Sequence, residues 1–217
     1  MSVKRLDLPE IRSIDPIQDL FFKPRTIFRI CRDEYEHREV DNEGYVTECF
    51  SGDTRVTDLD PELKQFLVDK VGSKTVVSRI RNEDCSLYVA RTVDDGQPAG
   101  FYWGVIAASS PVWHDSFRVP TQSGLVFNAY VKEDHRRKGV YRLLQAVSHN
   151  HLLSSDDCEC VFTIVENRNT ASMGANREFG LQAASRNYLL KFLSVNVFSI
   201  VSGKETDIST VLTKGGL

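Results

Sequence analysis

The chain has 217 residues and a formal net charge of −3 at pH 7. Hydrophobic residues make up 41% of it and charged residues 26%, which is the usual balance of a soluble globular protein. This net charge provides no general attraction to nucleic acid, and no apolar run is long enough to span a bilayer. The totals therefore predict a folded domain that has neither a nucleic acid nor a membrane as partner.

The N-terminus and the cysteines bear on location and domain limits. The first residues, MSVKRLDLPEIRS, lack the apolar stretch of a secretory signal peptide. The five cysteines are scattered and odd in number, so we expect reduced thiols and a cytoplasmic location. Residues 1–24 mix prolines, charges and a short apolar clump and are interpreted as an N-terminal extension. The main domain is placed at residues 25–201, and a polar C-terminal tail at residues 202–217.

The first third of the chain predicts one strand and one helix. Apolar residues at 26–31 favour a strand, and the turn-rich stretch 41–58 indicates at most a weak hairpin. Residues 61–71 are predicted to form a helix, because Asp60 can cap its N-terminus and Gly72 can end it.

The rest of the chain alternates strands and helices. Two strands over residues 86–108 surround an Asp-Asp-Gly-Gln turn, and residues 109–122 are predicted to be irregular. Apolar strands at 124–131 and 160–166 flank a helix that begins at Val140, so a right-handed crossover should make them parallel neighbours. A short helix closed by Gly180 and two strands at 185–193 and 195–201 complete one mixed α/β sheet.

A run of basic residues lies where the strand at 124–131 passes into the next helix. His135 to Lys138 precede Gly139, and the helix follows at once. The first N–H groups of a helix have no partner within it, and its dipole places partial positive charge there. A glycine lets an anion approach the backbone, and flanking cations add charge-assisted hydrogen bonds. The run therefore predicts a phosphate or pyrophosphate site; the alternative is a solvated turn balanced by neighbouring carboxylates.

Two segments resemble signatures of the GNAT N-acetyltransferase superfamily. HRRKGVYRLL is similar to its acyl-CoA pyrophosphate loop, Q/R-x-x-G-x-G/A, with Arg136, Gly139 and Tyr141 at the three fixed places. ENRNTASMGANREFGLQ is similar to the second signature, in which a strand-end Asn (Asn169) precedes Ser172, and a Gly-Leu pair closes the helix. Tyr141 departs from the pattern, because Gly or Ala is usual there, and it is interpreted either as narrowing the phosphate site or as a core aromatic.

The resemblance covers about residues 85–195 and implies the GNAT acyl-CoA N-acyltransferase fold, an α/β (α+β) class with a mixed central sheet flanked by helices. In that fold the parallel strands 4 and 5 splay apart, and the pantetheine arm of the cofactor lies in the gap. The implied cofactor-binding residues are Ala129 and Val131 along the arm, Arg136, Arg137, Lys138, Gly139, Val140 and Tyr141 at the pyrophosphate, and Asn169 and Ser172 beyond.

The implied reaction is direct attack of an acceptor amine, on a small molecule or a peptide, at the thioester of an acyl-CoA such as acetyl-CoA, with no metal. The family's frequent general-acid Tyr aligns with Asn176, which cannot protonate a thiolate. No carboxylate lies in the strand where many members keep a general base. Glu166, at the end of the next strand, is the nearest replacement, and its alternative is a solvent-facing strand end. Tyr130 and His114 rank behind it as candidates.

Two readings of function stay open. The first is an acyl-CoA-dependent N-acyltransferase, and the second is a catalytically silent GNAT-fold module that binds CoA or a protein partner. The resemblance also allows a homodimer. A zinc site built from His149, His151, Cys158 and Cys160 is rejected because their spacing fits no standard site, and we expect Cys160 in the core and Cys158 partly exposed.

Overall fold

The computed structural model describes residues 22–52, 54–110, 112–114, 117–192 and 195–203. Its helices are α2 (Pro61–Val71), α3 (Ser73–Ile80), α4 (Val140–Ser154) and α5 (Thr170–Glu178), with short 3-10 turns η1 (Arg32–Glu34) and η2 (Glu133–His135). Its strands are β1 (Phe22–Cys31), β2 (Tyr45–Phe50), β3 (Cys85–Thr92), β4 (Pro98–Ala107), β5 (Val112–His114), β6 (Phe117–Val119), β7 (Ser123–Val131), β8 (Cys160–Glu166), β9 (Gln182–Phe192) and β10 (Val195–Gly203).

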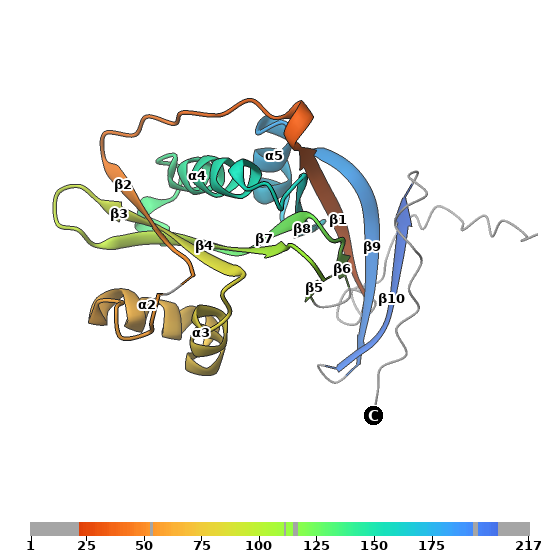
Figure 1. The fold of residues 1–217 in the computed structure, drawn as a ribbon, viewed down its shortest axis with the longest axis horizontal. Coiled ribbons are helices and arrows are strands. Elements are labelled where there is room, and N and C mark those ends of the chain that lie inside the picture. Colours follow the sequence, from red (N-terminus) through yellow and green to blue (C-terminus); the bar gives the residue numbers. More distant parts are fainter. Residues whose placement is uncertain (1–21, 53, 111, 115–116, 193–194, 204–217) are drawn as a thin grey trace, which may run out of the picture.

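Eight of these strands form one mixed sheet in the order β10-β9-β1-β8-β7-β4-β3-β2, with α4 and α5 on one face and α2 and α3 on the other (Figure 1). Within the described residues β7 and β8 are the parallel pair, and the helix α4 connects them. Their pairing runs from Ser123 opposite Cys160 to Val126 opposite Thr163 and ends there, although both strands continue. The predicted splay of the two parallel strands is therefore confirmed.

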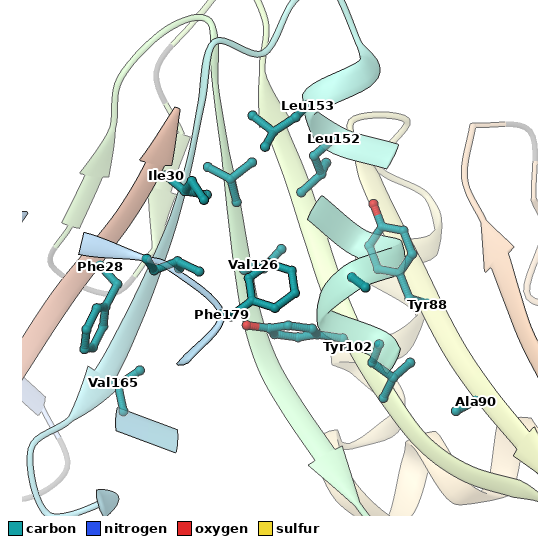
Figure 2. Packing of buried hydrophobic residues seen from close by; sticks show 14 of the residues in the cluster. Phe28, Ile30, Tyr88, Ala90, Tyr102, Val126, Leu152, Leu153, Val165 and Phe179 are labelled. Carbon is teal, nitrogen blue, oxygen red and sulfur yellow. The ribbon is translucent and has the colours of Figure 1, made fainter. Parts of the chain in front are cut away.

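The helix α4 packs on β3, β4 and β7 through one apolar face. Val140, Leu144 and Leu152 are buried there, because residues at such spacings return to the same side of a helix. They join a core that extends across the sheet to Phe28 and that includes Phe179 at the end of α5 (Figure 2). This layer fixes the start of α4 against the end of β7, which is where the basic loop lies.

The opposite face is covered by α2 and α3. The Asp60 side chain caps α2 by accepting a hydrogen bond from the backbone N–H of Leu63 at 2.8 Å, as the sequence predicts. The helix α3 was not predicted, because its Thr-Val-Val run has β-branched side chains that lower helix propensity. Burial of Val76 and Ile80 against the sheet stabilises it nonetheless. In the part of the chain that the structure describes, no helix has both the length and the apolar character needed to cross a membrane.

Two local predictions differ from the structure. The described residues of the stretch 41–58 form no hairpin among themselves: their strand β2 pairs with β3, from Tyr45 opposite Thr92 to Phe50 opposite Leu87. Residues 109–122 contain the small hairpin of β5 and β6. The hairpin prediction is wrong because β3, the true partner of β2, is distant in sequence and local turn residues do not indicate it.

The domain limits remain predictions, but the sheet reaches slightly beyond them. Phe22 in β1 pairs with Leu190 in β9, and β10 runs to Gly203. Both predicted limits therefore fall within strands, and most of the predicted extension and tail lies outside the described residues.

The expectation of five reduced cysteines is wrong. Cys31 and Cys160 lie directly opposite each other in the antiparallel pair of β1 and β8, and a disulfide joins them. The pair is 129 residues apart in sequence, and only strand register brings it together. The expected burial is also reversed, because Cys158 is fully buried and Cys160 is partly exposed. A cytoplasmic location stays a prediction.

Candidate functional site

The basic loop, residues 135–139, turns the chain from η2 into α4. Arg137 has φ +61° and Gly139 has φ +81°, both in the left-handed region that few side chains adopt. Gly139 is the N-cap of α4, and no side chain caps the helix. The first N–H groups of α4 are thus available to an anion, next to two exposed arginines, Arg136 and Arg137.

A distant turn holds this loop in place. The side-chain amide of Asn42 donates to the carbonyl of Lys138 at 3.0 Å, and a Cβ added to Gly139 would lie only 3.0 Å from the same nitrogen. The Tyr45 hydroxyl shares a hydrogen bond with Nδ1 of His135 at 2.9 Å, and the two rings meet edge to face. Neither Asn42 nor Tyr45 was predicted, because nothing in a local Asp-Asn-Glu-Gly turn indicates what it will contact.

A groove of about 760 Å³ runs from the end of β7 past the basic loop to α5. Nine of the ten predicted cofactor-binding residues line it: Ala129, Val131, Arg136, Arg137, Gly139, Val140, Tyr141, Asn169 and Ser172. Lys138 is not among its lining residues. One groove therefore brings together two segments that are far apart in the sequence.

A smaller cavity of about 230 Å³ occupies the gap where β7 and β8 part. Its walls include Tyr102 from β4, Phe127 from β7 and Glu166 from β8. Four residues, Ala129, Tyr141, Asn169 and Ser172, line both spaces, so the groove and the cavity adjoin. A ligand with one anionic end and one extended arm could occupy both.

Glu166 lies at the wall of this cavity, at the last position of β8. Its carboxylate accepts a hydrogen bond from Nε of Arg168 at 2.8 Å, and its side chain is 30% exposed. Arg25 on β1 stands directly opposite it in the sheet. The predicted base candidate thus borders the gap between the strands, close to positive charge.

Asn169 and Asn176 have structural contacts as well as positions in the site. The Asn169 side chain caps α5 by accepting from the N–H of Ser172 at 3.1 Å. Asn176 is fully buried: its side-chain oxygen accepts from Gln145 on α4 at 3.0 Å, and its nitrogen donates to the Ser172 carbonyl at 2.7 Å. Asn176 therefore ties α5 to α4.

Tyr141 reaches from the first turn of α4 to this asparagine. Its hydroxyl lies 3.5 Å from Nδ2 of Asn176, and its ring centroid is 5.9 Å from that of Tyr102. Tyr102 is buried, which raises the pKa of its hydroxyl well above the usual range, and it contacts the Thr163 hydroxyl at 3.4 Å. Tyr141 is thus half-buried at the junction of groove and cavity rather than at the phosphate end alone.

The further candidates are dispersed. Tyr130 lines the groove, but its ring packs on Phe66 of α2, and His114 lies in β5. His149 is wholly buried, whereas His151 bonds the Tyr88 hydroxyl, so the two do not form a joint ligand pair. The one potential metal-ligand group among the described residues is Cys31, Asp33 and Glu34, and its cysteine sulfur is in the disulfide.

Solved structures with this architecture include two GCN5-related N-acetyltransferases. A GCN5-related N-acetyltransferase from Sphaerobacter thermophilus has 17% identity and a TM-score of 0.56 over 79% of this chain and 53% of its own. One from Kribbella flavida has 10% identity and a TM-score of 0.50 over 79% of this chain and 60% of its own. The chain has the GNAT fold. A Drosophila protein has 12% identity and a TM-score of 0.56 over 80% of this chain and 52% of its own.

The GNAT fold is thus shared at low sequence identity. The chain spans about half to three fifths of the length of these three structures. No protein-family model matches the sequence, and no curated protein matches it. The likeness therefore concerns the fold alone.

Proposed function

We propose that this GNAT-fold protein is an acyl-CoA-dependent N-acyltransferase, with acetyl-CoA as the first donor to test and an amine of a small molecule or peptide as acceptor. The observation that carries the proposal is the continuity of the groove with the gap between β7 and β8. One end of this space has an open helix N-terminus and exposed arginines. The other end has open strand backbone, so the space suits a molecule with a pyrophosphate and an amide-bearing arm.

The pyrophosphate would bind the basic loop. Arg136 and Arg137 would contribute charge, and the backbone of Gly139, Val140 and Tyr141 would contribute N–H donors. The carbonyl of Lys138 is directed at Asn42. Because C=O and N–H of one trans peptide point in opposite directions, the N–H of Gly139 is directed away from Asn42.

The pantetheine arm would lie along β7. Beyond Val126 this strand pairs with β4 but no longer with β8, so its backbone groups on the β8 side have no strand partner, although the Val131 carbonyl accepts a hydrogen bond from Nε of Arg136 at 3.3 Å. Asn128 and Ala129 are exposed there. The amides of the arm would pair with Ala129 and Val131 as a neighbouring strand does, and Asn169 and Ser172 would border the arm on the other side.

The acceptor amine would reach the thioester from the β8 side of the cavity, next to Glu166. A carboxylate there can hold an incoming ammonium group and accept its proton through water. The amine nitrogen then attacks the thioester carbon. Substitution of Glu166 with Gln should lower turnover while leaving CoA affinity within about twofold, and unchanged turnover would remove Glu166 from this role.

A second function has one observation in its favour. Asn176, at the place of the family's usual acid, is buried and bonded, which suits a catalytically silent module that binds CoA or a partner. The test is calorimetric titration with acetyl-CoA, followed by thiol release in the presence of amines. Arg136→Glu should abolish binding, and Arg81→Glu, next to α3 on the opposite face, is the matched control. Binding without turnover would favour a silent module that binds CoA, and absence of binding would overturn the acyltransferase and leave a module that binds a partner.

A further inference from the structure

Tyr141 carries the hydroxyl best placed for chemistry where the groove meets the cavity. Of the four residues that line both spaces, Tyr141 and Ser172 have hydroxyl groups. The acidity of a phenol is close to that of an alkyl thiol, whereas that of an aliphatic alcohol is far weaker. A phenol can therefore exchange a proton with a thiolate at low free-energy cost.

The contacts of Asn176 orient this phenol. The oxygen of Asn176 is occupied by the Gln145 amide at 3.0 Å, so its nitrogen is the atom that faces Tyr141, at 3.5 Å. An amide nitrogen can only donate, so the Tyr141 oxygen is the acceptor of this contact. This contact does not use the phenol O–H, and a phenolate formed by losing that proton keeps a donor beside it.

Tyr102 is a second neighbour of the Tyr141 ring. Its ring lies 5.9 Å from that of Tyr141, and burial, reinforced by the neighbouring Tyr141, raises its pKa well above the usual range. Tyr102 therefore stays protonated and neutral, and a neutral hydroxyl tolerates a transient charge nearby better than a second phenolate would. Together, Tyr102 and Asn176 surround Tyr141 with neutral polar groups.

We propose that Tyr141 is the proton donor to the leaving thiolate, which rests on the acyltransferase function proposed above. The amine nitrogen bonds to the thioester carbon, the carbon–sulfur bond breaks, and its electron pair stays on sulfur. Sulfur takes the proton from the Tyr141 hydroxyl. The proton that the nitrogen releases returns through water to the phenolate, so thioester and amine become amide and free thiol. The two departures from the GNAT pattern, Tyr141 and Asn176, are thereby in contact and complementary.

The test compares Tyr141→Phe with wild type, using acetyl-CoA as donor, hydroxylamine and an amine panel as acceptors, and thiol release as readout. We expect kcat to fall about 100-fold or more, with acetyl-CoA affinity unchanged. With 4-nitrothiophenyl acetate, whose leaving thiolate needs no proton, the difference between the proteins should nearly vanish. A merely structural effect would lower the two rates equally, and that outcome would overturn the proposal.

Two controls keep the result interpretable. Tyr88→Phe removes a buried hydroxyl that bonds His151 and lines neither space, and should leave kcat unchanged. If Tyr141→Phe does not fold, Tyr141→Met carries the same expectation. If wild type releases thiol and Tyr141→Phe has the same kcat, the role of Tyr141 is rejected and the acyltransferase function is retained. If wild type binds acetyl-CoA but releases no thiol with any amine, both the role of Tyr141 and the acyltransferase function are rejected. The silent CoA-binding module is then the remaining function.

Discussion

Asn42 donates a hydrogen bond to the carbonyl of Lys138 from 96 residues away in the sequence. This contact fixes the peptide between Lys138 and Gly139, whose N–H the proposed pyrophosphate would use. The chain segment that carries Asn42 is itself attached to the sheet. Tyr45 is the first residue of β2, and the backbone N–H of Val93 donates a hydrogen bond to the Gly44 carbonyl. The basic loop is thus held in place by the far edge of the same sheet.

Loss of this brace should weaken binding of the phosphate end only. Asn42→Ala removes one hydrogen bond, worth about 1 kcal/mol, so acetyl-CoA affinity should fall roughly fivefold. Asn42→Asp puts a carboxylate opposite the carbonyl and should cost more. Acetyl-pantetheine, which lacks the pyrophosphate, serves as control in the same calorimetric titration. An equal loss for both ligands would show that Asn42 acts on general stability instead.

Gly139 should tolerate no side chain. At φ +81° an L-residue costs about 1–2 kcal/mol, and its Cβ would press on the Asn42 amide at 3.0 Å. Gly139→Ala should therefore lower both the free energy of unfolding in urea and acetyl-CoA affinity. Gly174→Ala is the matched control in α5, since it has open space and no positive φ, and it should stabilise the protein by about 0.5–1 kcal/mol. Equal effects of the two variants would contradict this account.

His149 should make the fold sensitive to acid. Its Nδ1 donates to the Gln145 carbonyl at 2.7 Å, and burial lowers its pKa from 6.5 to about 4. As pH falls from 6.5 towards 4, the unfolded chain binds a proton that the folded chain does not, so stability declines over this window. Between pH 7 and pH 5 the loss should be about 2 kcal/mol. Urea unfolding at both pH values measures it, and His149→Gln should remove that part of the slope; an unchanged slope would reject the assignment.

The disulfide between Cys31 and Cys160 can be tested by counting free thiols. Alkylation of the denatured, unreduced protein should label Cys49, Cys85 and Cys158, and leave Cys31 and Cys160 unlabelled until a reductant is added. Intact mass before and after reduction gives the two counts. Labelling of all five cysteines without reductant would mean that the pair is reduced in solution.

The sequence was most informative where one element or two adjacent ones decide the structure. The Asp60 cap, the hairpin of β3 and β4, and the β7–α4–β8 crossover all follow from local periodicity and turn residues. The basic loop was recognisable because its residues are contiguous. Asn169 was placed by the resemblance to the second GNAT signature, and in the structure its side chain caps α5.

Contacts between distant segments could not be predicted. Tyr45 meets His135 across 90 residues, and Cys31 meets Cys160 across 129. The contact between Tyr141 and Asn176 could not be predicted either, because it depends on how α4 and α5 pack and not on either helix alone. From sequence the two residues read as unrelated departures; in the folded chain they are neighbours.

The early end of the pairing between β7 and β8 has a consequence for association. A free strand edge normally lies at the border of a sheet, where it can recruit another chain. Here the part of β7 beyond Val126, which no longer pairs with β8, lies in the interior of the sheet, between β4 and β8. Under the proposed function, a narrow arm would enter this gap and add itself as a strand, whereas the strands on both sides leave no border at which a second sheet could pair. The fold would thus offer β-type recognition to a small ligand at a position where the sheet has no border that could recruit another chain.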